Sequence, residues 1–128
     1  MGGPCLKNRS ILIATDNFAL AFKMKDALEG ANVIYPVNTI EDALDLIMSS
    51  AVINCALLGV NLQGEATFVA ADHLMRRQIP FVFLVGHNAS DIPDHYGHID
   101  RYEEPIVPAQ LIERIESLAP SSSSFAKF

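Results

Sequence analysis

Three short, predominantly apolar runs constrain the fold of this chain more than any other feature. They span Ser10–Thr15, Val52–Leu58 and Phe81–Val85, and each has a polar residue, Gly or Pro within two residues of both ends. Short continuous apolar runs are typical of strands covered on both faces, as in a parallel sheet between two layers of helices. We therefore expect a parallel sheet at the centre of the protein.

Segments with the periodicity of amphipathic helices separate these runs. The clearest is residues 40–48, where apolar side chains recur at i, i+3, i+4, i+7 and i+8 and Thr39 precedes them as an N-cap. Gly30 ends an earlier helical segment, and Pro108 suits the first turn of the last one. We expect helices at residues 17–29, 39–48, 67–77 and 108–118, and two further strands at residues 32–37 and 99–102.

The alternation of strands and helices predicts an α/β fold. Five β–α units give a single-domain, doubly wound, five-stranded parallel sheet with helices on both faces, because a closed barrel needs eight units. Our first choice of strand order is the flavodoxin-like 2-1-3-4-5, with right-handed crossovers. Residues 60–65 should form a loop, and the polar segment 86–97 should hold at most a short helix. We assign the domain to residues 1–119 and expect the Ser-rich tail, 120–128, to be disordered.

Composition excludes several classes of function. A net charge of −6 argues against nucleic-acid binding, because phosphate contacts need clustered Lys and Arg. No apolar run is long enough to span a bilayer, so we expect no membrane contact. Cys5 and Cys55 do not form a disulfide framework, which favours a reducing, cytoplasmic location.

A functional site in such a sheet is expected where the carboxyl ends of the strands meet. Ligands of open α/β sheets bind there, at the point where the strand order reverses, which lies between the first and third strands in this order. The residues that follow the strands are Thr15 and Asp16, Gly59, Val85, and the turn Glu104–Pro105. Function should be argued from these positions.

At these positions the sequence resembles response-regulator receiver domains. The order and spacing of four segments carry the resemblance, which extends over residues 9–119. Ile11–Asn17 resembles the first strand of receivers with its acidic pocket, and Ala56–Glu65 resembles their third strand with the loop that follows it. Phe81–His87 resembles their fourth strand, and Tyr102–Ile106 resembles the Lys-Pro turn after the fifth.

The resemblance also implies that the phosphorylation pocket is degenerate. Receivers accept a phosphoryl group on an Asp that ends the third strand, where this chain has Gly59. Their acidic pair for Mg²⁺ is reduced to Asp16, and their Thr or Ser after the fourth strand is replaced by Val85. Glu104 stands where a Lys before the proline, here Pro105, would contact the phosphoryl group. The resemblance further implies a cis peptide bond between these last two residues.

The pocket leaves alternatives open. Asp16 and Glu104 are weak candidates for holding a cation, although two solvated carboxylates are the preferred interpretation and we expect no metal. His87, His95 and His98 share a loop with two Asp, but their spacing matches no zinc signature. A small-ligand-binding module on the same scaffold is the second hypothesis. A small flavodoxin-like enzyme is the third hypothesis. It ranks last because the sequence shows no nucleophile and base that converge.

We therefore interpret the chain as a pseudo-receiver in two-component-type signalling. It would be no enzyme, would need no cofactor, and would act by phosphorylation-independent contact with a protein partner: a kinase, a regulator or a second copy in a homodimer. Receivers commonly dock through the last strand and last helix. The residues expected on that face are Arg101, Tyr102, Glu113 and Arg114.

Overall fold

The computed structural model describes residues 9–28, 30–49, 52–86, 91–103 and 106–118. A five-stranded parallel sheet crosses the molecule, with the order β2-β1-β3-β6-β7. This is the predicted flavodoxin-like order. The strands are β1 (Ser10–Ala14), β2 (Asn32–Val37), β3 (Cys55–Gly59), β6 (Phe81–Val85) and β7 (Arg101–Glu103).

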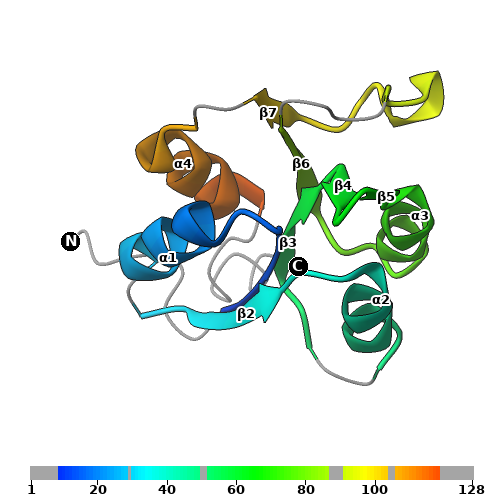
Figure 1. The fold of residues 1–128 in the computed structure, drawn as a ribbon. Helices are drawn as coiled ribbons and strands as arrows, with labels where there is room; N and C mark the ends of the chain where they lie inside the picture. The colour runs from blue at the N-terminus through cyan, green and yellow to red at the C-terminus, as the bar shows by residue number, and fades with distance from the viewer. Residues whose placement is uncertain (1–8, 29, 50–51, 87–90, 104–105, 119–128) are drawn as a thin grey trace, which may run out of the picture.

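Helices cover both faces of the sheet (Figure 1). Helices α1 (Phe18–Ala27) and α4 (Pro108–Leu118) lie side by side on one face. Helices α2 (Ile40–Met48) and α3 (Phe68–Arg76) cover the other. The doubly wound architecture expected from the sequence is therefore confirmed.

The apolar runs divide their side chains between two cores. Because successive strand residues point to opposite faces, Leu12 and Leu58 pack toward α2 and α3, whereas Ile13 and Leu57 pack toward α1 and α4. All five residues of β3 are buried, which explains the absence of polar alternation in the sequence. The apolar faces of the helices complete each core. In α2, for example, Ala43 and Ile47 are buried against the sheet side of the molecule.

Side chains fix the starts of two helices. Asn17 precedes α1 and accepts a hydrogen bond from the backbone N–H of Leu20 at 3.1 Å. Thr39 precedes α2 and accepts one from the N–H of Asp42 at 3.2 Å, as the predicted N-cap requires. Each bond satisfies an N–H group that has no partner within its helix.

The predicted loop at residues 60–65 contains a small antiparallel hairpin instead. Its strands are β4 (Asn61–Leu62) and β5 (Glu65–Ala66), and the hairpin leads into α3. Both residues of its turn have positive φ, 51° at Gln63 and 85° at Gly64. Such turns match the twist of the two strands that they join. The expectation of a loop was wrong because two-residue strands show no periodicity in sequence.

Three predicted strands differ at their ends. β1 ends at Ala14 rather than Thr15. β3 begins at Cys55 rather than Val52, because the preceding Asn54 uses its side chain to accept a hydrogen bond from the N–H of Ser10 at 2.8 Å. β7 is short and covers residues 101–103 rather than 99–102. The predicted tail at 120–128 lies outside the described residues.

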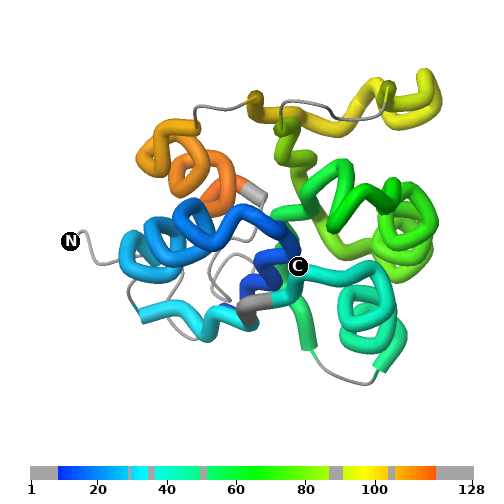
Figure 2. The backbone as a smooth tube through the Cα atoms, in the orientation of Figure 1, coloured from blue at the N-terminus to red at the C-terminus, as the bar shows by residue number. Residues whose placement is uncertain are grey.

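Between β6 and β7, the described residues hold one 3₁₀ turn, η1 (Asp94–Tyr96). The backbone tube in Figure 2 follows this segment, in yellow, back to β7. Tyr96 is buried, and its ring stacks on Phe68 at 5.6 Å and meets Phe83 edge-on at 5.7 Å. Its hydroxyl bonds to the carboxylate of Asp72 and to the Phe68 carbonyl. The predicted short helix is thus a 3₁₀ turn that a single aromatic side chain anchors to α3.

Candidate functional site

The carboxyl ends of β1 and β3 lie beside each other, as the strand order requires. Ala14 pairs with Leu58, which brings Thr15 and Asp16 next to Gly59. Thr15 is buried; its N–H donates to the carbonyl of Val37, and its hydroxyl accepts from the N–H of Asn17 at 3.1 Å. Thr15 therefore follows β1 directly and holds the start of α1.

The Asp16 carboxylate is engaged within the chain. One of its oxygens accepts a hydrogen bond at 2.9 Å from the N–H of Gln63, 47 residues later. Gln63 occupies the left-handed region, where a residue other than Gly is uncommon. Asp16 thus links the end of β1 to the turn of the β4–β5 hairpin. Sequence reasoning missed this partner, because no local signal joins the two positions.

Position 59 leaves little room for a side chain. A Cβ atom there would lie 3.2 Å from the carbonyl oxygen of Ala14, 3.4 Å from that of Asn61, and 3.6 Å from a methyl group of Leu62. The first two neighbours are backbone atoms and cannot rotate away. Leu62 is fully buried and belongs to the core under α2 and α3. A Cβ at position 59 would therefore be crowded by two carbonyl oxygens and one methyl group.

Thr67 closes the same region from the other side. This fully buried residue donates its hydroxyl to the carbonyl of Gly59 at 2.6 Å and lies 3.1 Å from that of Val60. Its N–H donates to the Val60 carbonyl at 2.9 Å, which returns the hairpin to β3. Sequence reasoning placed Thr67 only at the start of a helix; a Thr before an apolar helix suggests an N-cap, but its hydroxyl points back to β3.

The other predicted site residues are Val85, Glu104 and Pro105. Val85 ends β6 half-buried and pairs with Glu103, which is exposed. Glu104, Pro105 and the bond between them lie outside the described residues. Among the residues that the structure describes, no three His, Cys, Asp or Glu side chains are grouped to hold a metal.

The predicted interaction face is divided between the two sides of β7. Tyr102, Glu113 and Arg114 line one shallow hollow of about 260 Å³. Arg101 belongs to the opposite side, where its guanidinium reaches the carbonyl of Tyr96 at 3.5 Å. Arg114 forms an ion pair with Asp100. Burial, reinforced by the Asp100 carboxylate, raises the pKa of the Tyr102 phenol. The structure thus brings three of the four residues together.

No model of a known protein family matches the sequence, and no curated protein matches it either. Solved structures do. A response regulator receiver protein from Sinorhizobium medicae superimposes with a TM-score of 0.72 at 20% identity, over 89% of this chain and 96% of that one. SdrG from Sphingomonas melonis gives 0.75 at 27% identity, over 87% and 96%. A CheY-like receiver domain from Methanospirillum hungatei gives 0.71 at 22%, over 87% and 93%.

These likenesses cover nearly all of each compared chain, so the resemblance to receiver domains seen in the sequence is confirmed at the level of the fold. None of the described helices has the length and apolarity to cross a membrane. The fold alone does not give the function, which depends on the residues at the site.

Proposed function

We propose that this chain is a receiver-like signalling domain that has lost phosphorylation and acts by contact with a protein partner. The observation that carries the proposal is the end of β3, where Gly59 has no acceptor side chain and a Cβ atom would lie against the backbone of Ala14 and the side chain of Leu62. A phosphoryl-accepting residue at this position would have to push these neighbours aside at its Cβ. We further propose that the protein is not an enzyme and that it acts in the cytoplasm.

The chemistry of phosphoryl transfer supports this proposal. The reaction needs a nucleophile, and glycine has none. It also needs Mg²⁺ and a further cation to neutralise charge that spreads over three oxygens. Asp16 already accepts a hydrogen bond from the N–H of Gln63, and Val85 has no hydroxyl to bind a phosphoryl oxygen. Glu104 carries the wrong sign of charge for that role.

A site that phosphorylation does not switch favours a partner that recognises a single conformation of the domain. Phosphorylation switches a protein by adding charge that new contacts must satisfy. In this chain the corresponding positions are already joined by an exposed hydrogen bond of Asp16 and a buried one of Thr67. The partner would therefore be bound whether or not a phosphodonor is present. The hollow formed by Tyr102, Glu113 and Arg114 is our candidate surface.

The first test addresses the chemistry. The full chain is incubated with acetyl phosphate and Mg²⁺, and separately with beryllofluoride and Mg²⁺, and analysed by intact mass spectrometry and by two-dimensional NMR. We expect no phosphoryl adduct and no shift of signals from β1, β3 or α3. A receiver with an intact Asp serves as the positive control. An acyl phosphate on any Asp or Glu of this chain would refute the proposal.

The second test addresses the partner. The wild-type chain and a Glu113→Lys variant are used to capture proteins from the native host, with and without ATP and Mg²⁺. We expect one specific protein, captured equally in both conditions and lost with the variant. A capture that requires ATP would contradict phosphorylation-independent binding. A thermal shift caused by Mg²⁺, a nucleotide or a flavin would instead support the small-ligand or cation-binding alternative, because a ligand at 100 times its Kd adds about 2.7 kcal/mol.

A further inference from the structure

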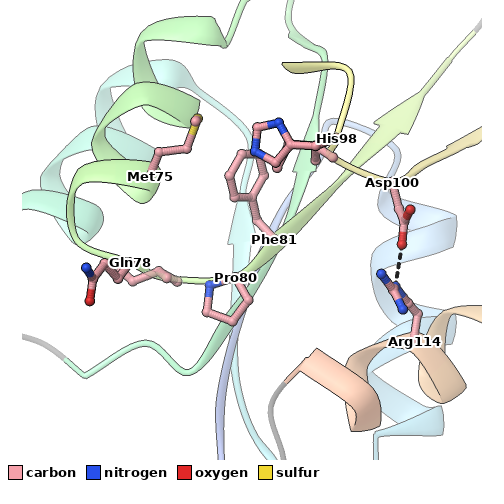
Figure 3. A pocket seen from close by; sticks show the side chains of 9 residues that line it. Met75, Gln78, Pro80, Phe81, His98, Asp100 and Arg114 are labelled. Carbon is pink, nitrogen blue, oxygen red and sulfur yellow. Dashed lines mark ion pairs between the residues drawn. The ribbon is translucent and has the colours of Figure 1, made fainter. Parts of the chain in front are cut away.

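A second concave region lies at the opposite end of the sheet from the candidate site. It is a groove of about 400 Å³ at the amino ends of β6 and β7, within the size range of about 300–1,000 Å³ that binding pockets show. In Figure 3, Met75 and Gln78 at the end of α3 form one side, and His98, Asp100 and Arg114 form the other.

The floor and walls of the groove are mainly apolar. Ile79 and Phe81 are buried beneath it, and Pro80 and Ile99 complete the apolar lining. Met75 is 36% exposed at the edge, although it is a large hydrophobic residue. The polar lining residues are Gln78, His98 beside Phe81, and Asp100, which pairs with Arg114. A groove of this kind is suited to an apolar side chain rather than to an ion.

The described part of the connection between β6 and β7 does not cover the groove. In a doubly wound sheet a helix normally follows each strand and covers its face. Here, the described part of this connection holds only η1, which Tyr96 anchors to α3. The start of β6, at Phe81, and the residues before β7, at Ile99, are therefore left beside an uncovered edge of α3.

The chain itself supplies an occupant. Arg114 lines the groove, and α4 ends at Leu118, one turn later and about 6 Å along the helix axis. Residues 119–128, which lie outside the described residues, read Ala-Pro-Ser-Ser-Ser-Ser-Phe-Ala-Lys-Phe. Phe125 is seven residues beyond Leu118, a reach of up to roughly 25 Å in extended chain. The groove is thus within reach of both phenylalanines.

Composition and charge agree with this occupant. Four consecutive serines form a short polar spacer, and the segment after them places two aromatic residues three apart. An aromatic side chain buries about 150–250 Å² when it is fully covered. Lys127 is the one charged side chain of the segment, and it is opposite in sign to the chain's net charge of −6.

We propose that the C-terminal segment Phe125–Phe128 folds back and docks a phenyl ring into this groove, between α3 and the start of β6. The segment would cover the apolar face between the end of α3 and the start of β6. This inference does not rest on the proposed function, since the groove and the candidate site lie at opposite ends of the strands.

The test uses a nitroxide spin label on Ser124→Cys in the full chain, with Cys5→Ser so that the label has one site. Cys55 is fully buried and remains unlabelled. The readout is the NMR intensity of the methyl groups of Met75 and Ile99, with Ile40 at the far end of α2 as the reference. We expect about a twofold or greater loss of intensity at the groove if the docked state is at least half-populated.

The matched control carries Phe125→Ser and Phe128→Ser with the same label. It keeps the tether and the spacer but removes the rings, so the groove signals should recover. Equal broadening in this control would overturn the proposal, because the label would then be near the groove without docking.

A mixed sample separates an intramolecular contact from a second copy. Spin-labelled chain without isotopes is added to isotope-labelled chain without a spin label. We expect no broadening at Met75 or Ile99. Broadening in this sample, or its absence in the single-chain experiment, would also overturn the proposal, the former by showing that another copy fills the groove.

Discussion

At the scale of single residues, the requirement for glycine at position 59 is steric and does not come from its backbone dihedral angles. Its missing Cβ would contact backbone oxygens of Ala14 and Asn61. Gly64 is the reverse case, with φ of 85° and no atom within 4 Å of the missing Cβ. Gly59 is therefore required by its close neighbours, and Gly64 by its positive φ.

We predict that Gly59→Ala lowers the free energy of unfolding by about 1–3 kcal/mol through overpacking. Gly59→Asp should cost more, because it also buries a carboxylate without a partner. Gly64→Ala should cost about 1–2 kcal/mol from its left-handed backbone alone. Urea unfolding of the three variants measures these losses. A Gly59→Asp variant as stable as the wild type would show that the site has room for an acceptor.

Thr67 provides a second residue-scale prediction. Thr67→Val keeps the shape but removes the hydroxyl that donates to the Gly59 carbonyl at 2.6 Å. Because the buried carbonyl loses this donor, we expect a loss of about 1–3 kcal/mol in urea unfolding. Thr67→Ser retains the hydroxyl and should lose less. Equal losses in the two variants would assign the effect to packing of the methyl group instead.

Tyr96 should make stability depend on alkaline pH. Burial raises the pKa of its phenol from 10.0 to about 12, and the hydrogen bond and charge of Asp72 act in the same direction. The native state thus holds the proton more tightly than the unfolded chain. The resulting stabilisation is complete below pH 10 and is lost as the pH rises through about 12.

We predict that the Tm of the wild type falls more steeply between pH 10 and 12 than the Tm of Tyr96→Phe, which has no phenol to ionise. Cys55, whose pKa burial raises from 9.0 to about 12, contributes equally to both proteins and cancels in the comparison. Thermal denaturation followed by circular dichroism measures the difference. Parallel curves would exclude a linked ionisation at Tyr96.

At the scale of elements, the β4–β5 hairpin depends on a residue outside it. Asp16 accepts a hydrogen bond from the N–H of Gln63, inside a turn whose two residues both have positive φ. The hairpin strands have two residues each, too few to be stable as an isolated hairpin. Buried Leu62 and the contact with Asp16 therefore hold it to the sheet.

We predict that Asp16→Ala increases the amide exchange rate of Gln63 by about fivefold or more, as expected for the loss of about 1 kcal/mol of local stability. The exchange of β3 amides should change little, because β3 lies between two neighbours in the sheet. Asp45→Ala, an exposed change on α2, is the control. An unchanged rate at Gln63 would show that the hairpin does not depend on its contact with Asp16.

At the scale of the whole molecule, the face of β7 and α4 is our candidate for self-association. Arg114 already pairs with Asp100, so reversing its charge would disturb the fold as well as an interface. Glu113 is exposed and is the better probe. We expect Glu113→Lys to weaken any dimer, more strongly at low salt, in sedimentation velocity experiments. A single monomeric species of the wild type at high concentration would contradict the dimer.

The sequence by itself determined the sheet, its order and the layers of helices. Continuous apolar runs such as Phe81–Val85 report strands covered on both faces, and the periodicity of residues 40–48 reports one buried helix face. These signals are local and repeat along the chain, so they can be read without a structure. The absence of an Asp at the end of β3 is likewise a matter of residue identity at Gly59.

Only the tertiary structure decided what occupies the candidate site. The partners of Asp16 and Gly59 are Gln63, Leu62 and Thr67, which local periodicity does not indicate. The groove likewise forms between Met75, Phe81 and Arg114, which are far apart in the sequence. Contacts of this kind depend on distance and direction between elements, which strand and helix patterns do not contain, because side-chain bonds form only after the backbone has brought the elements together.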